Sequence, residues 1–411
     1  MRPSLLRSVA IALVTATVSG TSAVAGDLFT VTVTSNGVTD TAGFNSAVQA
    51  IDELKNGQLN ALIPTYNSTS IASGQINYRG LQVEASYPTN GTTLVFQVPS
   101  IGLNQSFTGT TRDESQQLLV DYLKKNNEYG AIMHALAAVS PSDPVAGNPT
   151  SLQANIVADG FNSAFATSPA VSPTPKTSQP AVNTVQVGLE YGHFTNSSTN
   201  VDAYTIPLSY SFNVGPEDNY RLSIDLPITY INTQGAQSGA ASLGIGLTIP
   251  ISDNWSLTPR ISGGATGSID LASVAAMTAG SVTSAYKFVY DGYGFIVGNM
   301  FGYSHSIDLK FGTYSFDPKI GDAFTKNGVM IDIPTGRWGI DVPFLPGADM
   351  QVFATDTRFW GTKLYENSFQ ELGFNIGSSE VTFISHDIRL GATYIHGQHS
   401  NGATANIGFT F

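Results

Sequence analysis

The residues with the clearest chemical potential lie near the end of the chain, in the stretch HGQHSNG at residues 396–402. His399 and Ser400 supply a general base and a hydroxyl nucleophile, the pair of groups that acyl transfer uses. They are adjacent, so on a β-strand their side chains would point to opposite faces. Asn401-Gly402 is also a common sequence in tight hairpin turns. The stretch is therefore either a catalytic pair or a polar turn between two strands, and we favour the turn.

The same stretch is similar to the His-x-Ser-Asn sequence of outer-membrane phospholipases and lipid A deacylases. That resemblance implies acyl transfer near a lipid boundary, with His399 and Ser400 as the catalytic residues. In this chain the two residues are neighbours, and Gln398, at the correct parity, is no nucleophile. A lipid hydrolase is therefore the alternative to the main expectation, which is a protein without catalytic activity. The histidines are scattered and cysteine is absent, so no metal site or other cofactor is expected.

Composition excludes further classes. The chain has 411 residues, of which 42% are apolar and only 12% charged, so it is not a disordered polymer. Its net charge is −12, and its 18 Lys and Arg residues are spread along the chain. Because binding to phosphates depends on clustered basic residues, no nucleic-acid partner is expected.

Residues 1–25 have the features of a secretory signal peptide. Arg2 and Arg7 charge its start, an apolar segment follows, and Ala23-Val24-Ala25 fits a cleavage site between small residues. The mature protein is then expected to begin near Gly26. No later apolar run reaches the roughly 18 residues that a membrane helix needs. These features alone also fit a soluble periplasmic or secreted protein.

Residues 26–165 mix helical and strand patterns, which predicts a small α+β domain. "INYRGLQVEASYP" and "TTLVFQVPSI" flank Asn90-Gly91, which predicts a hairpin with positive φ angles at the turn. The Pro, Ser and Thr content of residues 166–182 predicts a semi-extended linker. One helix is expected where apolar residues recur at helical spacing, at Phe44, Ala47, Val48, Ile51 and Leu54. A second is expected after Thr111, which forms a capping box with Glu114. Two further helices are expected at 128–138 and 150–164.

From residue 183 onward, short alternating runs separated by turn residues replace the helical spacing. Two candidates between 294 and 333 are compatible with one bent strand, so we expect twelve strands, with ten or fourteen as alternatives. The candidate strands are 183–194, 200–213, 219–231, 240–251, 255–263, 274–290, 294–303, 308–316, 326–333, 349–359, 367–377, 383–396 and 402–411.

The run at 219–231 shows which medium the apolar side meets. Its apolar residues share one parity from Tyr220 to Tyr230, and its polar residues, among them Arg221 and Asp225, share the other. A soluble β-sandwich also alternates. However, ten tilted residues span roughly 25 Å, the height of a lipid-facing band with an aromatic residue at each rim. Longer and shorter connections are expected to alternate, the segment 264–273 being a long one. Residues 183–411 are therefore predicted to form an antiparallel transmembrane β-barrel.

The inward parity carries charged residues. Two interpretations are open: the charges line a water-filled pathway, or they pair across neighbouring strands and brace a closed interior. The predicted lumen-lining residues are Glu190, Arg221, Asp225, Arg260 and Arg389.

The chain ends in NGATANIGFTF, with Ile407, Phe409 and Phe411 on one parity. This resembles the terminal strand of bacterial outer-membrane proteins, which implies that these residues form an assembly signal for the barrel assembly machinery. The whole arrangement resembles autotransporter-type barrels of Gram-negative bacteria, which implies an outer-membrane location and a role in transport, display or scaffolding. Residues 26–165 are expected in the periplasm or in the lumen, which the helix at 150–164 could enter. Outer-membrane lipid is the expected surrounding, a diffusion channel for small solutes is a further alternative, and the oligomeric state stays open.

Overall fold

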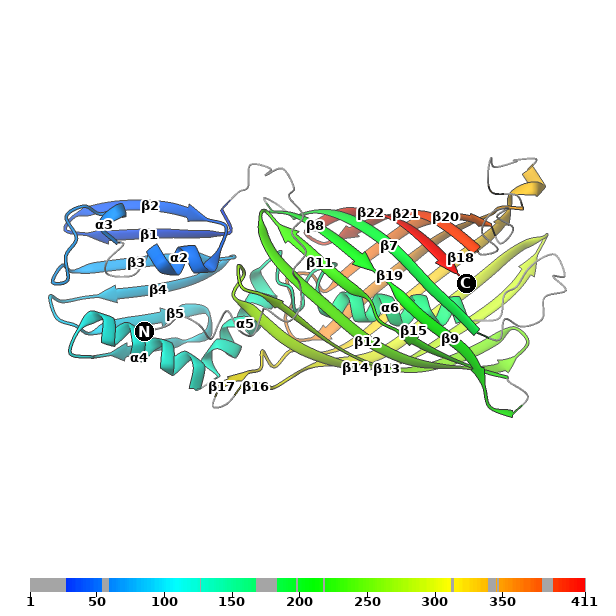
Figure 1. The fold of residues 1–411 in the computed structure, drawn as a ribbon, viewed down its shortest axis with the longest axis horizontal. Coiled ribbons are helices and arrows are strands. Elements are labelled where there is room, and N and C mark those ends of the chain that lie inside the picture. Colours follow the sequence, from blue (N-terminus) through cyan, green and yellow to red (C-terminus); the bar gives the residue numbers. More distant parts are fainter. Residues whose placement is uncertain are drawn as a thin grey trace.

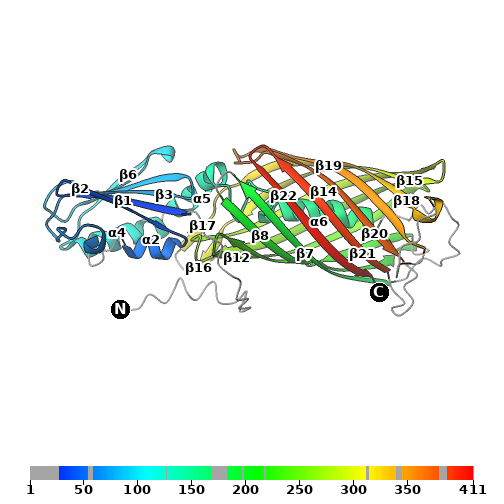
Figure 2. The same cartoon turned by 90° about the horizontal axis from the view of Figure 1, so that it is seen from above.

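A computed structural model describes residues 27–53, 59–125, 127–167, 183–196, 199–216, 219–311, 314–338, 345, 347–378 and 387–410. The predicted signal peptide, all but the first two residues of the predicted linker, and Phe411 lie outside the described residues. Figure 1 shows two parts side by side, a small sheet domain and a long barrel, and Figure 2 shows the same arrangement from above.

The N-terminal part is a six-stranded antiparallel sheet in the order β2-β1-β3-β4-β5-β6. Alternate residues of β1, such as Phe29, Val31 and Val33, are buried, because helices cover one face of the sheet. The elements are β1 (Phe29–Ser35), β2 (Val38–Phe44), α2 (Ala47–Glu53), α3 (Leu59–Leu62), β3 (Ala72–Tyr78), β4 (Leu81–Tyr87), β5 (Leu94–Val98), η1 (Pro99–Ile101), β6 (Leu103–Phe107), α4 (Arg112–Lys125), α5 (Glu128–Val139) and α6 (Leu152–Thr167).

The predicted helices are present, and the capping box is built with one variation. Thr111 Oγ1 accepts a hydrogen bond from the backbone N–H of Glu114 at 3.2 Å, while the Glu114 carboxylate accepts one from the N–H of Thr110 at 2.5 Å. The hairpin prediction was wrong in detail. The positive φ angles occur at Arg79 and Gly80, inside the supposed first arm, because β3 and β4 already pair there. Asn90-Gly91 lies in the next connection without positive φ.

The second part is a closed antiparallel barrel of twelve strands, as predicted. β22 pairs with β7 and closes the ring. Two barrel strands are each interrupted by a proline, which lacks the N–H that the ladder needs: Pro207 separates β8 from β9, and Pro227 separates β10 from β11. The strands are β7 (Asn183–Asn196), β8 (Thr199–Ile206) with β9 (Leu208–Val214), β10 (Tyr220–Asp225) with β11 (Ile228–Thr233), β12 (Ala236–Ser252), β13 (Trp255–Ser268), β14 (Ser273–Tyr290), β15 (Tyr293–Ile307), β18 (Gly321–Pro334), β19 (Asp349–Gly361), β20 (Ser368–Ser378), β21 (Asp387–Gly397) and β22 (Ser400–Thr410).

One candidate strand is not part of the barrel. In the segment 308–316, β16 (Leu309–Phe311) pairs with β17 (Tyr314–Phe316) in a small separate sheet, between β15 and β18 in the chain. A short helical turn, η3 (Thr335–Trp338), follows β18. The excess candidate therefore arose from a β-rich connection and not from a bent wall strand.

The predicted alternation of connection lengths was wrong. We call the mouth beside the N-terminal domain the near mouth and the opposite one the far mouth. The supposed long segment 264–273 is mostly strand, so only 269–272 connects β13 to β14. The 396–402 turn falls at Gln398 and His399, with Asn401 and Gly402 inside β22. Among the fully described connections, 234–235, 269–272, 362–367 and 398–399 lie in the near mouth, and 253–254 and 291–292 lie in the far mouth, so short connections occur at both ends.

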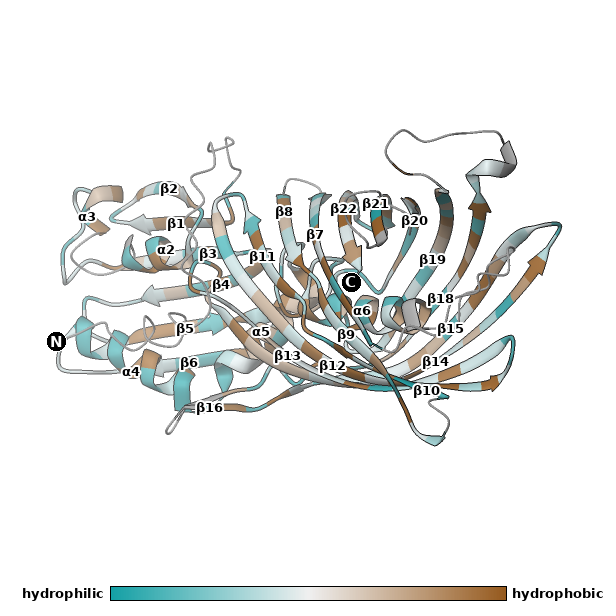
Figure 3. Ribbon diagram, turned by 45° about the vertical axis from the view of Figure 1, so that its right-hand side comes forward, coloured by the Kyte–Doolittle hydropathy of each residue, from teal (hydrophilic) through white to brown (hydrophobic). Residues whose placement is uncertain are grey.

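The two faces of the wall differ as the sequence predicts. Leu226, between β10 and β11, and Ile228 on β11 are exposed on the outside, whereas Ser223 and Asp225 on β10 are buried in the lumen. Hydrophobic and hydrophilic residues alternate along the strands in Figure 3. Tyrosines near both rims flank the apolar band, with Tyr204 and Tyr230 close together at the near rim. An apolar exterior with aromatic rims and no open edge is the surface that a bilayer requires.

Separately, no helix among the described residues combines the length and the apolar character needed to cross a membrane.

Candidate functional site, a lumen filled by helix α6

Helix α6 lies inside the barrel (Figure 1). Ser151 caps its start, because Ser151 Oγ accepts a hydrogen bond from the N–H of Ala154 at 3.3 Å. Side chains on several sides of the helix are buried, among them Leu152, Ile156 and Phe161. A helix buried around most of its circumference belongs in an interior. The predicted helix at 150–164 therefore enters the lumen, one of the two positions that the sequence left open.

Two glycines of the wall make room for the aromatic end of α6. Gly298 on β15 and Gly328 on β18 are direct partners in the ladder and face inward. A Cβ at Gly298 would lie 2.3 Å from Cζ of Phe165, and one at Gly328 would lie 3.0 Å from Cζ of Phe161. The two phenyl rings contact each other edge to face, with centroids 4.5 Å apart. The wall is therefore shaped to accept these rings.

Polar contacts hold the other parts of α6. At the near-mouth end of the helix, Gln153 Nε2 donates to Asp322 Oδ2 at 2.7 Å and to Ser304 Oγ at 3.1 Å. Further along the helix, Ser163 Oγ donates to Ser223 Oγ at 3.1 Å. Hydrogen bonds at both ends fix the helix along its axis and in rotation.

Two ion pairs brace the lumen wall. Arg260 on β13 binds Asp225 on β10, which brings together two of the predicted lumen residues from strands separated by β12. Lys326 on β18 binds Glu371 on β20, which also accepts a hydrogen bond from Thr355. Lys326 Nζ lies 5.7 Å from the ring centroid of Phe161, so α6 covers this pair. Both pairs cross an intervening strand.

The other predicted lumen residues also lie at the inward parity. Arg221 donates to Thr184 Oγ1 at 2.5 Å, to Ser211 Oγ at 2.7 Å and to Asn213 Oδ1 at 3.1 Å. Arg389 forms an ion pair with Asp349 at 3.1 Å, toward the far mouth. These contacts fit the interpretation in which charges brace a closed interior. Glu190 forms no ion pair among the described residues, but it lies close enough to Asp159 of α6 and to Glu371 for their charges to interact.

The N-terminal domain is bound to the near mouth by hydrogen bonds from several elements. Tyr78 Oη donates to the carbonyl oxygen of Leu271 at 3.0 Å, and Tyr129 Oη donates to that of Ala272. Burial raises the pKa of the Tyr129 phenol well above its ordinary value, so the phenol remains a donor. On other connections, Asn127 contacts Asp317, and His134 contacts Pro318. The domain therefore covers the near mouth.

The structure does not bring His399 and Ser400 together. His399 Nδ1 lies 3.0 Å from the carbonyl oxygen of Tyr365, in the turn. Ser400 Oγ is buried on the inward face and hydrogen-bonds to no described atom. Neither geometry activates a hydroxyl.

Of the predicted assembly signal, Ile407 and Phe409 lie on β22, paired with Leu189 and Val187 of the closing strand β7.

Several residues of this site were not predicted from the sequence. Lys326 and Glu371 carry the inward parity of their strands, so parity alone pointed to them once the strands were placed. The candidate strand at 326–333 began too late to show that Lys326 lies within a ladder that starts at Gly321. Gly298 and Gly328 give no signal as isolated glycines, because their role depends on rings from α6.

No model of a known protein family matches the sequence, and neither does any curated protein. Many solved structures match this chain in fold, including the following three. The β domain of the Bordetella autotransporter BrkA is 11% identical, covering 56% of this chain and 99% of that chain, with a TM-score of 0.40. The translocator domain of the autotransporter NalP from Neisseria meningitidis is 11% identical (63% and 95% covered; TM-score 0.43). An outer-membrane channel from Pseudomonas putida F1 is 10% identical (59% and 99% covered; TM-score 0.40).

Proposed function

We propose that this chain is an outer-membrane barrel that displays its own N-terminal domain at the cell surface and anchors it through α6. The observation that carries the proposal is the position of α6. The helix runs through the lumen from the domain at the near mouth towards the far mouth. The first barrel strand, β7, begins at the far mouth, and the last strand, β22, ends there.

The orientation follows from the route of the chain. A chain with a secretory signal arrives from the periplasm, and the assembly machinery reads the terminal strand there. A terminus that is read from the periplasm stays at the periplasmic mouth, which is then the far mouth. The N-terminal domain lies at the opposite end, outside the cell. This placement differs from the expectation from the sequence, which put residues 26–165 in the periplasm or in the lumen, and it requires outer-membrane lipid around the wall.

The contents of the lumen support display over diffusion. A channel for small solutes needs a continuous open path, but α6 occupies the lumen and the N-terminal domain covers the near mouth. The ion pairs Arg260–Asp225 and Lys326–Glu371 add to the packing. We therefore propose an anchoring role without catalysis.

Cysteine labelling tests this orientation, because the native chain contains no cysteine. Gln75→Cys places a thiol on the exposed face of the N-terminal sheet, and Asn254→Cys places one in an exposed turn of the far mouth. In intact cells, a membrane-impermeant maleimide should label the first variant. The second should react only after the outer membrane is permeabilised. The reverse pattern would overturn the surface placement, and recovery of the protein in a soluble periplasmic extract would overturn the membrane assignment.

A further inference from the structure

The outer wall carries a row of polar side chains that neither the apolar band nor the proposed anchoring role explains. Asn299 on β15 pairs with Asn327 on β18, which pairs with Asp356 on β19, which pairs with Gln370 on β20. We call these four residues the outer polar row. Their sequence neighbours at the opposite parity are buried in the lumen: Met300, Lys326, Thr357 and Phe369.

Part of the row lies at the depth of the apolar band. Because barrel strands are tilted, a row of paired residues runs obliquely around the wall. Gln370 lies close to the near-mouth end of β20, whereas Asn299 and Asn327 lie near the middle of their strands. Along β15 the outward neighbours of Asn299 are Val297 and the 64% exposed Phe301. The two asparagines therefore interrupt the lipid-facing surface.

The four polar groups differ in how well they are satisfied. The Asp356 carboxylate accepts hydrogen bonds from Arg358 Nε at 2.7 Å and from Gln370 Nε2 at 2.8 Å. By contrast, no described residue hydrogen-bonds to the exposed side chain of Asn299 or of Asn327. An amide without a partner in hydrocarbon is costly, because no water is present to replace the missing bonds. A partner outside this chain would remove that cost.

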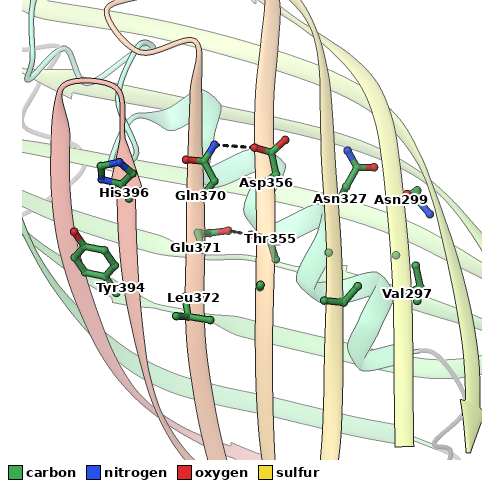
Figure 4. A pocket seen from close by; sticks show the side chains of 14 residues that line it. Val297, Asn299, Asn327, Thr355, Asp356, Gln370, Glu371, Leu372, Tyr394 and His396 are labelled. Carbon is green, nitrogen blue, oxygen red and sulfur yellow. Dashed lines mark hydrogen bonds between the residues drawn. The ribbon is translucent and has the colours of Figure 1, made fainter. Parts of the chain in front are cut away.

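The surface around the row has a shallow groove with a volume of about 480 Å³. Figure 4 shows its lining side chains on neighbouring strands, with the hydrogen bond between Gln370 and Asp356. The residues that line it include the small Ala354 and the larger Leu372 and Tyr394. Such a groove lets side chains of a second wall approach the amides.

We propose that the outer polar row is the contact surface for a second copy of this chain in the membrane. Each asparagine amide offers both donors and an acceptor, so two identical rows related by a two-fold axis can satisfy each other. Together with Arg358, the row carries one negative group, the Asp356 carboxylate, and one positive group, the Arg358 guanidinium. Two copies that meet at this row therefore bring together equal numbers of positive and negative charges. A lipid phosphate, by contrast, would meet the Asp356 carboxylate. The proposal rests on the proposed membrane location.

Single-cysteine cross-linking in outer-membrane fractions tests the contact, since the chain has no native thiol. Asn327→Cys should give a disulfide-linked dimer upon mild oxidation. The matched control is Ile245→Cys, an outward residue (39% exposed) on β12, which lies well away from β18 in the strand order. It should remain monomeric under the same conditions. Equal cross-linking of both variants, no dimer of the first, or a product with a different protein would each overturn the proposal.

A second variant tests the hydrogen bonds without a thiol. Asn299→Leu combined with Asn327→Leu should weaken dimerisation about tenfold or more in detergent sedimentation, because the variant removes the amide hydrogen bonds between the two copies. An unchanged equilibrium would contradict the proposal. Heat-modifiable migration of the same samples reports the folded membrane barrel separately. Its loss would count against the proposed function, whereas its presence without dimers would count against this inference alone.

Discussion

The chain contains two antiparallel sheets that use the same alternation in opposite senses. In β1, the apolar residues Phe29, Val31 and Val33 face the helices of the domain, and the intervening threonines face away from them. In β10 and β11, the apolar residues face outward and the polar ones face α6. Alternation therefore establishes that a sheet has two unlike faces. The surroundings decide which face is turned out.

The edges of the two sheets differ for the same reason. The N-terminal sheet ends at β2 and β6, which pair on one side only. The barrel joins β7 to β22 and has no end. Water satisfies free backbone groups at an edge, but hydrocarbon does not. Substitutions on the two sheets test this difference between a water-exposed and a lipid-exposed surface.

The largest effect is expected from a charge in the core of the N-terminal sheet. Val31→Asp places an unpaired carboxylate at a fully buried position, which should cost about 4–5 kcal/mol or more and unfold the domain. Limited proteolysis should then digest residues 27–125, while the barrel keeps its heat-modifiable migration. Simultaneous loss of the barrel would show that the two sheets do not fold independently.

A slightly smaller effect is expected from a broken ion pair in the lumen. Asp225→Ala leaves Arg260 buried without its carboxylate, which should destabilise the barrel by about 3–5 kcal/mol in urea unfolding from lipid vesicles. The double variant Asp225→Ala with Arg260→Met should recover much of this loss. If the single variant were as stable as the native protein, water and not Asp225 would be stabilising the charge of Arg260.

The outward faces themselves give the most direct comparison. Leu243→Arg on the outside of β12 should cost about 2–4 kcal/mol in lipid. Gln82→Arg on the exposed face of β4 should change the stability of the domain by no more than about 0.5 kcal/mol. Equal costs in the same unfolding assay would refute the difference in surroundings.

The fit of α6 to the wall should show a moderate effect. Gly298→Ala forces the added methyl group toward Phe165, and overpacking of this kind costs about 1–3 kcal/mol. Adding Phe165→Ala should relieve the clash, so that the double variant is more stable than the sum of the single changes predicts. Strict additivity of the two changes would indicate that the ring and the glycine are not in contact.

The smallest effect concerns the cap of α4, a feature of a water-exposed helix. Hydrogen bonds from Thr110 hold the pKa of Glu114 below its ordinary value. The stability that this carboxylate contributes is present above the unfolded-state pKa and is lost as pH falls through the lowered folded-state pKa. The melting temperature of the domain should therefore decrease slightly in acid. Glu114→Gln should remove this pH-dependent component.

The sequence predicted those parts of the fold that depend on local pattern. Alternation from Tyr220 to Tyr230 identified the outward face, and the helix expected at 150–164 corresponds to α6. The sequence overestimated the number of turn residues. Asn401-Gly402 is typical of a turn, but pairing with β7 and β21 holds both residues in an extended conformation. Likewise, 308–316 has strand character, yet only the closed ring determines which strands belong to the wall.

The site was less accessible to prediction because it joins residues that are distant in the chain. Inward parity marked Asp225 and Arg260, but their pairing depends on the order of β10, β12 and β13. The recess for Phe161 and Phe165 depends on two glycines of β15 and β18. Such matches arise only when the helix and the wall have their final positions.

The filled lumen also sets a chronology for biogenesis. A finished ring occupied by α6 has no space through which a six-stranded sheet and its helices could pass. If the domain is displayed at the cell surface as proposed, residues 27–150 must therefore reach the near mouth as unfolded chain, or before β7 and β22 pair and close the ring. Under that proposal, premature folding of the N-terminal sheet would stall its passage, and slower folding would favour it.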